Sequence, residues 1–194
     1  MVEANKLAVG TLQRKYASGD ITPTEVIETH IKRADEGSDS VWITRREPSS
    51  LREQTQRLES ETDPTAVDWD SKPLYGIPFA VKDNINHAGT PTTAACPAYK
   101  FVPDEHATVV NKLLDAGAIL VGKTNMDQFA TGLVGTRSPY GETPNAIDPA
   151  YISGGSSSGS GVAVALGQVS FALGTDTAGS GRVPAALNGI IGIK

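Results

Sequence analysis

The sequence predicts an α/β fold, in which a mixed β-sheet is flanked by helices. Two observations carry this prediction. The first third of the chain has apolar residues at helical spacing, and from about residue 73 strand-like and helix-like segments alternate. Such alternation places helices on the faces of a sheet.

Composition narrows the class of protein. The 194 residues suffice for one domain with a core, and 39% of them are hydrophobic. The 17 basic and 22 acidic residues give a net charge of −5 without a basic cluster, which argues against nucleic acid or a membrane surface as the main partner. The single cysteine, Cys96, fits a reducing compartment, and the first residues lack a signal-peptide pattern. We therefore expect a cytoplasmic protein.

The segment from about residue 4 to 60 is predicted to be helical. One face of a first helix, ending at Gly19, carries Leu7, Leu12 and Tyr16. A second helix begins with the capping box Thr22–Glu25, with proline at its first position. A third helix is expected at about 50–60. We expect a polar, turn-rich connection over 61–72.

The segment from about 73 to 194 is predicted to be the α/β part. Strands are expected at 76–81, 118–121, 169–173 and 190–193, and helices at 107–116, 125–130 and 162–166. The loop at 132–153 is rich in Gly and Pro. Because the sequence ends inside an expected strand, we expect it to be the N-terminal part of a longer domain.

Two familiar motifs occur in the wrong context. Gly117–Thr124 matches the phosphate-loop pattern GxxxxGK[ST], but its variable positions are Ala-Ile-Leu-Val, which favour a strand rather than a loop. Gly155–Gly159 matches the GxSxG elbow of α/β-hydrolases. That fold needs a histidine after the serine, and all three histidines of this chain precede it.

The run 154–161 contains only Gly and Ser. By composition it could be a flexible linker. It opens directly onto an apolar helix, however, where clustered backbone N–H groups favour negative charge and hydroxyl groups could relay protons. We therefore interpret it as part of a site.

The segment Gly174–Arg182 follows an expected strand and holds Ser180 between two glycines. It could be an ordinary turn, but a serine in this position is well placed as an exposed nucleophile. The backbone N–H groups of an oxyanion hole would come from Thr177, Ala178, Gly179 and Ser180. We expect Asp176 and Arg182 to form an ion pair that fixes this loop.

Lys82 ends the apolar run 76–81. It could reach solvent, as most lysines do. If it is buried instead, its pKa falls and its amine can act as a base. The histidines His30, His87 and His106 have no metal-ligand spacing, and we predict no metal site.

Lys82, the Gly/Ser run and Ser180 together resemble the amidase signature family. The resemblance identifies Ser180 as nucleophile, Ser156 as the cis-serine of the triad and Lys82 as its base, with Ser157 supporting the loop. It covers most of the chain from about Leu74 onward. It also implies the amidase signature fold and a cis peptide bond between Gly155 and Ser156.

Within this family, the segments 92–97, 126–141 and 170–185 are most similar to the allophanate hydrolases. This resemblance implies a small carboxylated urea as the substrate, release of ammonia and no cofactor. It further implies a functional link to a biotin-dependent urea carboxylase and a homodimer in the full-length form. We expect residues 1–194 alone not to hydrolyse allophanate, since part of the substrate site would lie beyond them. Two alternatives stay open: an amidase of another subfamily, such as a glutamyl-tRNA amidotransferase A subunit, and a truncated fragment without catalysis.

Overall fold

The computed structural model describes residues 7–194. Its centre is a four-stranded sheet with the strand order β1-β3-β2-β4. These strands are β1 (Trp42–Arg45), β2 (Pro78–Lys82), β3 (Ile119–Thr124) and β4 (Phe171–Leu173). Strands β2, β3 and β4 are parallel, and β1 is antiparallel to β3, so the predicted mixed α/β sheet is confirmed.

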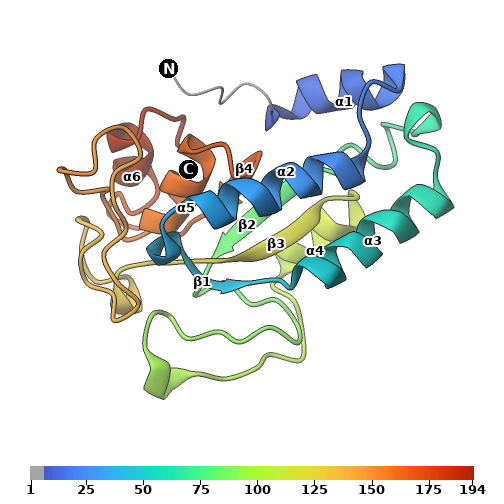
Figure 1. The fold of residues 1–194 in the computed structure, drawn as a ribbon. Coiled ribbons are helices and arrows are strands. Elements are labelled where there is room, and N and C mark those ends of the chain that lie inside the picture. The colour runs from blue at the N-terminus through green and yellow to red at the C-terminus, as the bar shows by residue number, and fades with distance from the viewer. Residues whose placement is uncertain (1–6) are drawn as a thin grey trace.

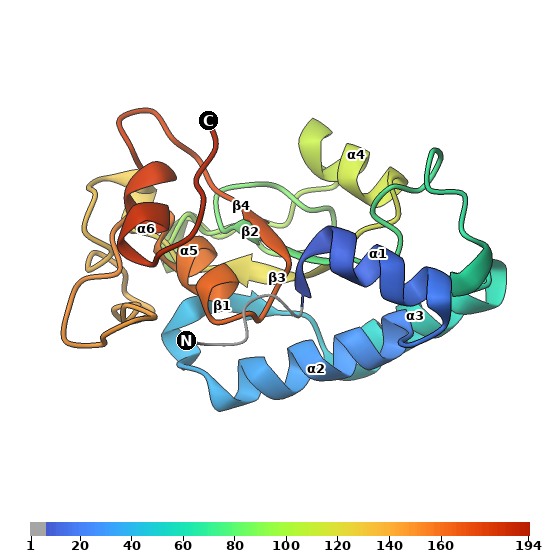
Figure 2. The same ribbon diagram turned by 90° about the horizontal axis from the view of Figure 1, so that it is seen from above.

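Helices cover both faces of the sheet (Figure 1). Helices α2 (Pro23–Glu36) and α3 (Pro48–Glu61) lie on one face, and α4 (Thr108–Asp115) lies on the other (Figure 2). The alternation of side chains along β2 produces this arrangement. Ala80 packs in the cluster with α2, α3 and α5 (Ser158–Ala165), while Phe79 and Val81 pack in the cluster with α4.

The helical start matches its sequence signals. Helix α1 (Val9–Ser18) packs Leu12 and Tyr16 against a cluster with Tyr75, and Gly19 ends it in the left-handed region at φ 74°. The capping box of α2 is present, with Thr22 Oγ1 accepting from the Glu25 N–H at 3.3 Å. Residues 4–6 of the predicted helical start lie outside the described residues.

The Gly/Ser run is buried, so its interpretation as a flexible linker is wrong. Helix α5 already begins at Ser158, inside the run. A Cβ atom at Gly159 would clash with the backbone of Val41 and Asn125. Glycine therefore permits α5 to lie against the chain segments at the ends of β1 and β3.

Two predicted elements in the second half are wrong. Asn125 does not start a helix, because its Oδ1 accepts from the Met126 N–H at 2.8 Å and from the Ser138 hydroxyl at 2.6 Å. The segment contains only the short 3-10 turn Gln128–Ala130, in which Phe129 has non-helical backbone angles (φ 52°, ψ 25°).

The predicted strand 190–193 does not form either. The Ile190 N–H donates to Ala185 O at 3.0 Å, at the end of α6 (Arg182–Leu187), and Gly192 packs against the same helix. These contacts hold the backbone on α6 rather than beside a strand. Strand β1 and helix α6 were not predicted.

The phosphate-loop match was correctly rejected. Residues 119–124 of that motif form β3, and Lys123 is fully buried. Lys123 Nζ donates to Pro91 O at 3.1 Å and to Thr92 Oγ1 at 2.5 Å, so it is not presented to a phosphate.

Candidate active site

Lys82 occupies the last position of β2, and its side chain is fully buried. Its Nζ donates to Ser156 Oγ at 2.7 Å and to Thr175 Oγ1 at 2.7 Å. Burial lowers the pKa of Lys82 to about 8, although the carboxylates of Asp127 and Asp176 oppose this shift. The neutral amine, which can accept a proton, is therefore much more accessible near physiological pH than in an ordinary lysine.

Ser156 lies just before α5, and the peptide bond between Gly155 and Ser156 is cis, as predicted. Two backbone hydrogen bonds hold this segment: Gly155 N–H donates to Leu133 O at 2.9 Å, and Asp127 N–H donates to Ser156 O at 3.1 Å. A Cβ atom at Gly155 would clash with the Asp127 carboxylate, which explains the need for glycine. The Ser156 side chain is thus fixed in front of Lys82.

Ser180 lies between β4 and α6 and is 8% exposed. Its carbonyl oxygen accepts from the Ser157 N–H at 3.0 Å, which ties its loop to the start of α5. No hydrogen bond joins Ser180 Oγ to Ser156 Oγ within the described residues. Ser180, Thr177 and Ala178 line a cavity of about 150 Å³, and Ala130 and Leu133 also contribute to its lining.

Asp176 organises the loop before Ser180, as predicted. Its carboxylate makes a two-pronged ion pair with Arg182, with Arg182 Nε 3.0 Å from Oδ2 and the terminal nitrogen 2.9 Å from Oδ1. It also accepts from the backbone N–H groups of Gly179, Gly181 and Arg182. The hydrogen bonds from Arg182 are the largest cause of a strongly lowered pKa of Asp176.

The backbone N–H groups predicted for an oxyanion hole are not equivalent. Gly179 N–H is occupied, since it donates to Asp176 Oδ1 at 2.9 Å. The N–H groups of Thr177, Ala178 and Ser180 form no hydrogen bond within the described part of the chain. These three residues also line the cavity at Ser180, so they are the stronger candidates.

Ser157 supports the loop through its side chain. Its Oγ lies 3.3 Å from both the carbonyl oxygen and the amide nitrogen of Thr175. Thr175 in turn accepts from Lys82 and, at 3.3 Å, from Asn84 Nδ2. Sequence reasoning did not single out Thr175, Asn84 or Asp127. A polar residue at the end of each parallel strand was the available signal for Asn84 and Thr175.

Three further observations concern possible metal ligands, a buried histidine and the length of the helices. Among the described residues, no group of three or more His, Cys, Asp or Glu side chains could hold a metal ion. His30 is buried in the core, where its Nδ1 lies 2.8 Å from Gln168 O. The helices of the described range are too short or too polar to cross a membrane.

Comparisons with known proteins identify the family of this chain. A family model described as Amidase matches residues 25–194. The chain is 57% identical over 156 residues to urea amidolyase of Lachancea kluyveri, covering 80% of the chain and 8% of that protein. It is 42% identical over 190 residues to the A subunit of glutamyl-tRNA(Gln) amidotransferase from Lactobacillus johnsonii, covering 96% of the chain and 37% of that relative.

The solved structures give the same result. Kluyveromyces lactis allophanate hydrolase superposes with a TM-score of 0.78 and 46% identity, over 93% of the chain and 29% of that structure. The chain thus spans well under half the length of these relatives. Because the family model covers most of the chain and the fold agrees, the chain belongs to the Amidase family, with the amidase signature fold.

Proposed function

We propose that this chain supplies the catalytic serines and lysine of an amidohydrolase that works through an acyl-enzyme on Ser180. The observation that carries the proposal is the 2.7 Å hydrogen bond between the buried Lys82 amine and Ser156 Oγ, beside the loop that holds Ser180. A buried amine with a pKa of about 8 suits a general base, whose pKa should lie near the working pH.

In this mechanism the proton moves along a short relay. Neutral Lys82 takes the proton of Ser156 as Ser156 takes the proton of Ser180, and Ser180 Oγ attacks the amide carbonyl. The N–H groups of Thr177, Ala178 and Ser180 stabilise the oxyanion. The proton returns through Ser156 to the leaving nitrogen, ammonia departs, and water hydrolyses the ester on Ser180. No metal or organic cofactor takes part. The relay requires Ser180 Oγ to approach Ser156 Oγ when substrate binds.

For the substrate, we propose allophanate, a small carboxylated urea. Two facts support this choice: the 57% identity to urea amidolyase and the structural similarity to an allophanate hydrolase. A cavity of about 150 Å³ at Ser180 also suits a small molecule. Allophanate is the product of carboxylating urea, so we further propose a functional link to a biotin-dependent urea carboxylase. The name urea amidolyase supports that link.

The second candidate is an amidotransferase component that releases ammonia from glutamine. The 42% identity to the A subunit of glutamyl-tRNA(Gln) amidotransferase favours it, and that identity extends over more of the chain than the match to urea amidolyase. The two candidates share the relay and differ in the amide that they cleave.

A chimera tests the shared relay and whether residues 1–194 support turnover of allophanate. Residues 1–194 replace the corresponding segment of Kluyveromyces lactis allophanate hydrolase, and ammonia release is measured with allophanate and with glutamine. We expect turnover of allophanate within about tenfold of the parent enzyme, a barrier change of no more than ~1.4 kcal/mol. We expect none above background in the matched Ser180→Ala chimera. A folded chimera that releases no ammonia from allophanate contradicts the substrate assignment, and release from glutamine favours the second candidate. The isolated chain, assayed in parallel, is expected to release no ammonia from allophanate.

A further inference from the structure

Two turns with unusual backbone geometry lie beside the candidate active site. Ala94, Ala95, Phe129 and Ala130 have φ values of 49°, 55°, 52° and 58°, and they are the only non-glycine residues of the described range with positive φ. The Phe129 N–H donates to Ala94 O at 3.0 Å, so the two turns are joined. Such conformations are uncommon outside glycine and cluster at ligand-binding and catalytic sites.

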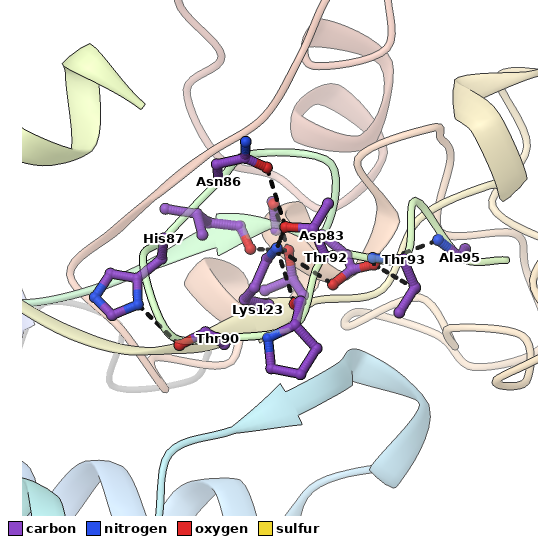
Figure 3. Close-up of polar contacts among 12 residues, drawn as sticks. Asp83, Asn86, His87, Thr90, Thr92, Thr93, Ala95 and Lys123 are labelled. Carbon is purple, nitrogen blue, oxygen red and sulfur yellow. Dashed lines mark hydrogen bonds and ion pairs between the residues drawn. The ribbon is translucent and has the colours of Figure 1, made fainter. Parts of the chain in front are cut away.

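A buried ion pair holds the first turn in place. Asp83 Oδ2 accepts from the N–H groups of Thr93 at 2.9 Å and Ala95 at 3.4 Å (Figure 3). Lys123 Nζ lies 3.6 Å from the other carboxylate oxygen, and both side chains are fully buried. Gln128 Nε2 donates to Ala95 O at 3.0 Å and so fastens the second turn to the first. The surroundings therefore fix the position of Phe129.

Phe129 forms one wall of a cavity of about 340 Å³. Tyr99 and Phe101 form the rest of an aromatic rim, with ring centroids 5.6 Å (Tyr99–Phe129) and 5.7 Å (Tyr99–Phe101) apart in edge-to-face contact. All three rings remain at least 40% exposed. Aromatic surfaces of this kind favour a flat ligand, which can stack on one ring and meet the edge of another.

Asn86, which also lines the cavity, has a hydrogen-bond donor that its neighbours do not use. Lys123 Nζ donates to Thr92 Oγ1 at 2.5 Å, and Thr92 Oγ1 donates to Asn86 Oδ1 at 3.1 Å. With its oxygen engaged, Asn86 has its Nδ2 left as a donor, and this nitrogen points away from the other labelled residues (Figure 3). It forms no hydrogen bond within the described residues. A chain of hydrogen bonds that starts at a cation polarises its members and makes the last donor stronger.

We propose that this cavity binds planar carboxamides, which stack on Phe129 and Tyr99 and accept a hydrogen bond from Asn86 Nδ2 through their carbonyl oxygen. A neutral ligand suits the site, because Asp83 accompanies Lys123 and offsets its charge. The site is distinct from the cavity at Ser180. Phe129 lines one cavity and the next residue, Ala130, lines the other, so the second turn forms the wall between them.

The test uses benzamide and the Ser180→Ala protein, in which turnover plays no part. Benzamide is titrated into the 15N-labelled chain, and the Asn86 side-chain amide signals are followed by NMR. Cyclohexanecarboxamide carries the same amide on a ring that is not flat. We expect saturable shifts with benzamide and about threefold to tenfold weaker binding of the cyclohexyl compound, as loss of stacking implies.

Variants locate the bound molecule. Asn86→Asp removes the donor at nearly constant size, and Phe129→Leu removes the ring. Each substitution should weaken the binding of benzamide about threefold to tenfold. Tyr151→Leu, at a 70% exposed aromatic residue elsewhere, is the matched control and should bind as the parent does. Should Asn86→Asp unfold, Tyr99→Leu at the exposed rim replaces it. The proposal is overturned if benzamide causes no saturable shift, or if the site variants bind it as well as the control. The result is independent of whether Ser180 is a nucleophile.

Discussion

Lys82 Nζ and Ser156 Oγ are 2.7 Å apart although their residues are separated by 74 positions in the sequence. The end of β2 and the start of α5 bring them together, and both side chains are fully buried. An amine in this position has two possible roles: it can take the serine proton, or it can only stabilise negative charge nearby.

Substitution by arginine separates these roles. Arginine keeps the positive charge but does not give up a proton at accessible pH. In the chimera with K. lactis allophanate hydrolase, Lys82→Arg should reduce kcat by about a hundredfold or more, nearly as much as Lys82→Ala. Steady-state ammonia release measures this, with circular dichroism as the control for folding. Retention of most activity by Lys82→Arg would mean that Lys82 provides only electrostatic support.

The lowered pKa of Lys82 also predicts a dependence of stability on pH. Between the folded value of about 8 and the ordinary value of 10.5, the unfolded chain binds a proton that the folded chain does not, so stability rises with pH across this window. Lys82→Met removes the burial cost and should raise the free energy of unfolding at pH 7 by about 1 to 3 kcal/mol.

Urea denaturation of the isolated chain at pH 7 and pH 10 measures this effect. The gain from Lys82→Met should be smaller at pH 10. Burial also lowers the pKa of Lys123 to about 8. The stability of the Lys82→Met variant therefore still depends in part on pH. A loss of stability in Lys82→Met at pH 7 would contradict the account of a costly buried amine.

Local sequence signals predicted the elements that depend on local interactions. The capping box at Thr22, the left-handed Gly19 and the apolar run before Lys82 each act within a few residues, and each prediction holds. The short strand β1 was missed, although Val41, Trp42 and Ile43 form a β-prone run that could have indicated it.

Predictions that depended on tertiary contacts were less successful. The strand expected at 190–193 has the right composition, but its backbone is held by α6. The hydrogen bond from the Gly179 N–H to Asp176 is local, since it spans only three residues, but the sequence analysis did not predict it. Motifs therefore singled out the candidates Lys82, Ser156 and Ser180 and the loop residues Asp176, Arg182 and Ser157. The contacts of Thr175, Asn84 and Asp127 required the structure.

Asp176 provides a test of how the loop before Ser180 is positioned. Asp176→Asn keeps the size of the side chain but weakens the ion pair with Arg182 and the acceptor for the Gly179 N–H. In the chimera we expect kcat to fall on the order of tenfold to a hundredfold, since a small displacement of a nucleophile has large kinetic effects. KM should change much less. Unchanged kcat would show that the ion pair does not position Ser180.

Because Asp83 and Lys123 form a buried ion pair, substitutions at the two residues should have coupled effects on the free energy of unfolding. Lys123→Met leaves the buried Asp83 carboxylate without its cation and should lower the free energy of unfolding by about 3 to 5 kcal/mol. The double variant Asp83→Asn, Lys123→Met should recover part of this loss, because no charge remains buried. Urea denaturation of the singles and the double gives the coupling energy. Strict additivity would mean that the two side chains do not interact.

The central claim is that Lys82 and Ser156 activate Ser180. The most direct measurement is the rate of covalent labelling by a fluorophosphonate as a function of pH, with mass spectrometry to locate the modified residue in the chimera. The account predicts modification of Ser180, at a rate that rises with pH to a plateau above about 8, the pKa of Lys82. Lys82→Arg should label far more slowly, and Ser180→Ala not at all. Labelling of Ser156 or Ser157 with Ser180 untouched, or an equal rate in Lys82→Arg, would contradict it.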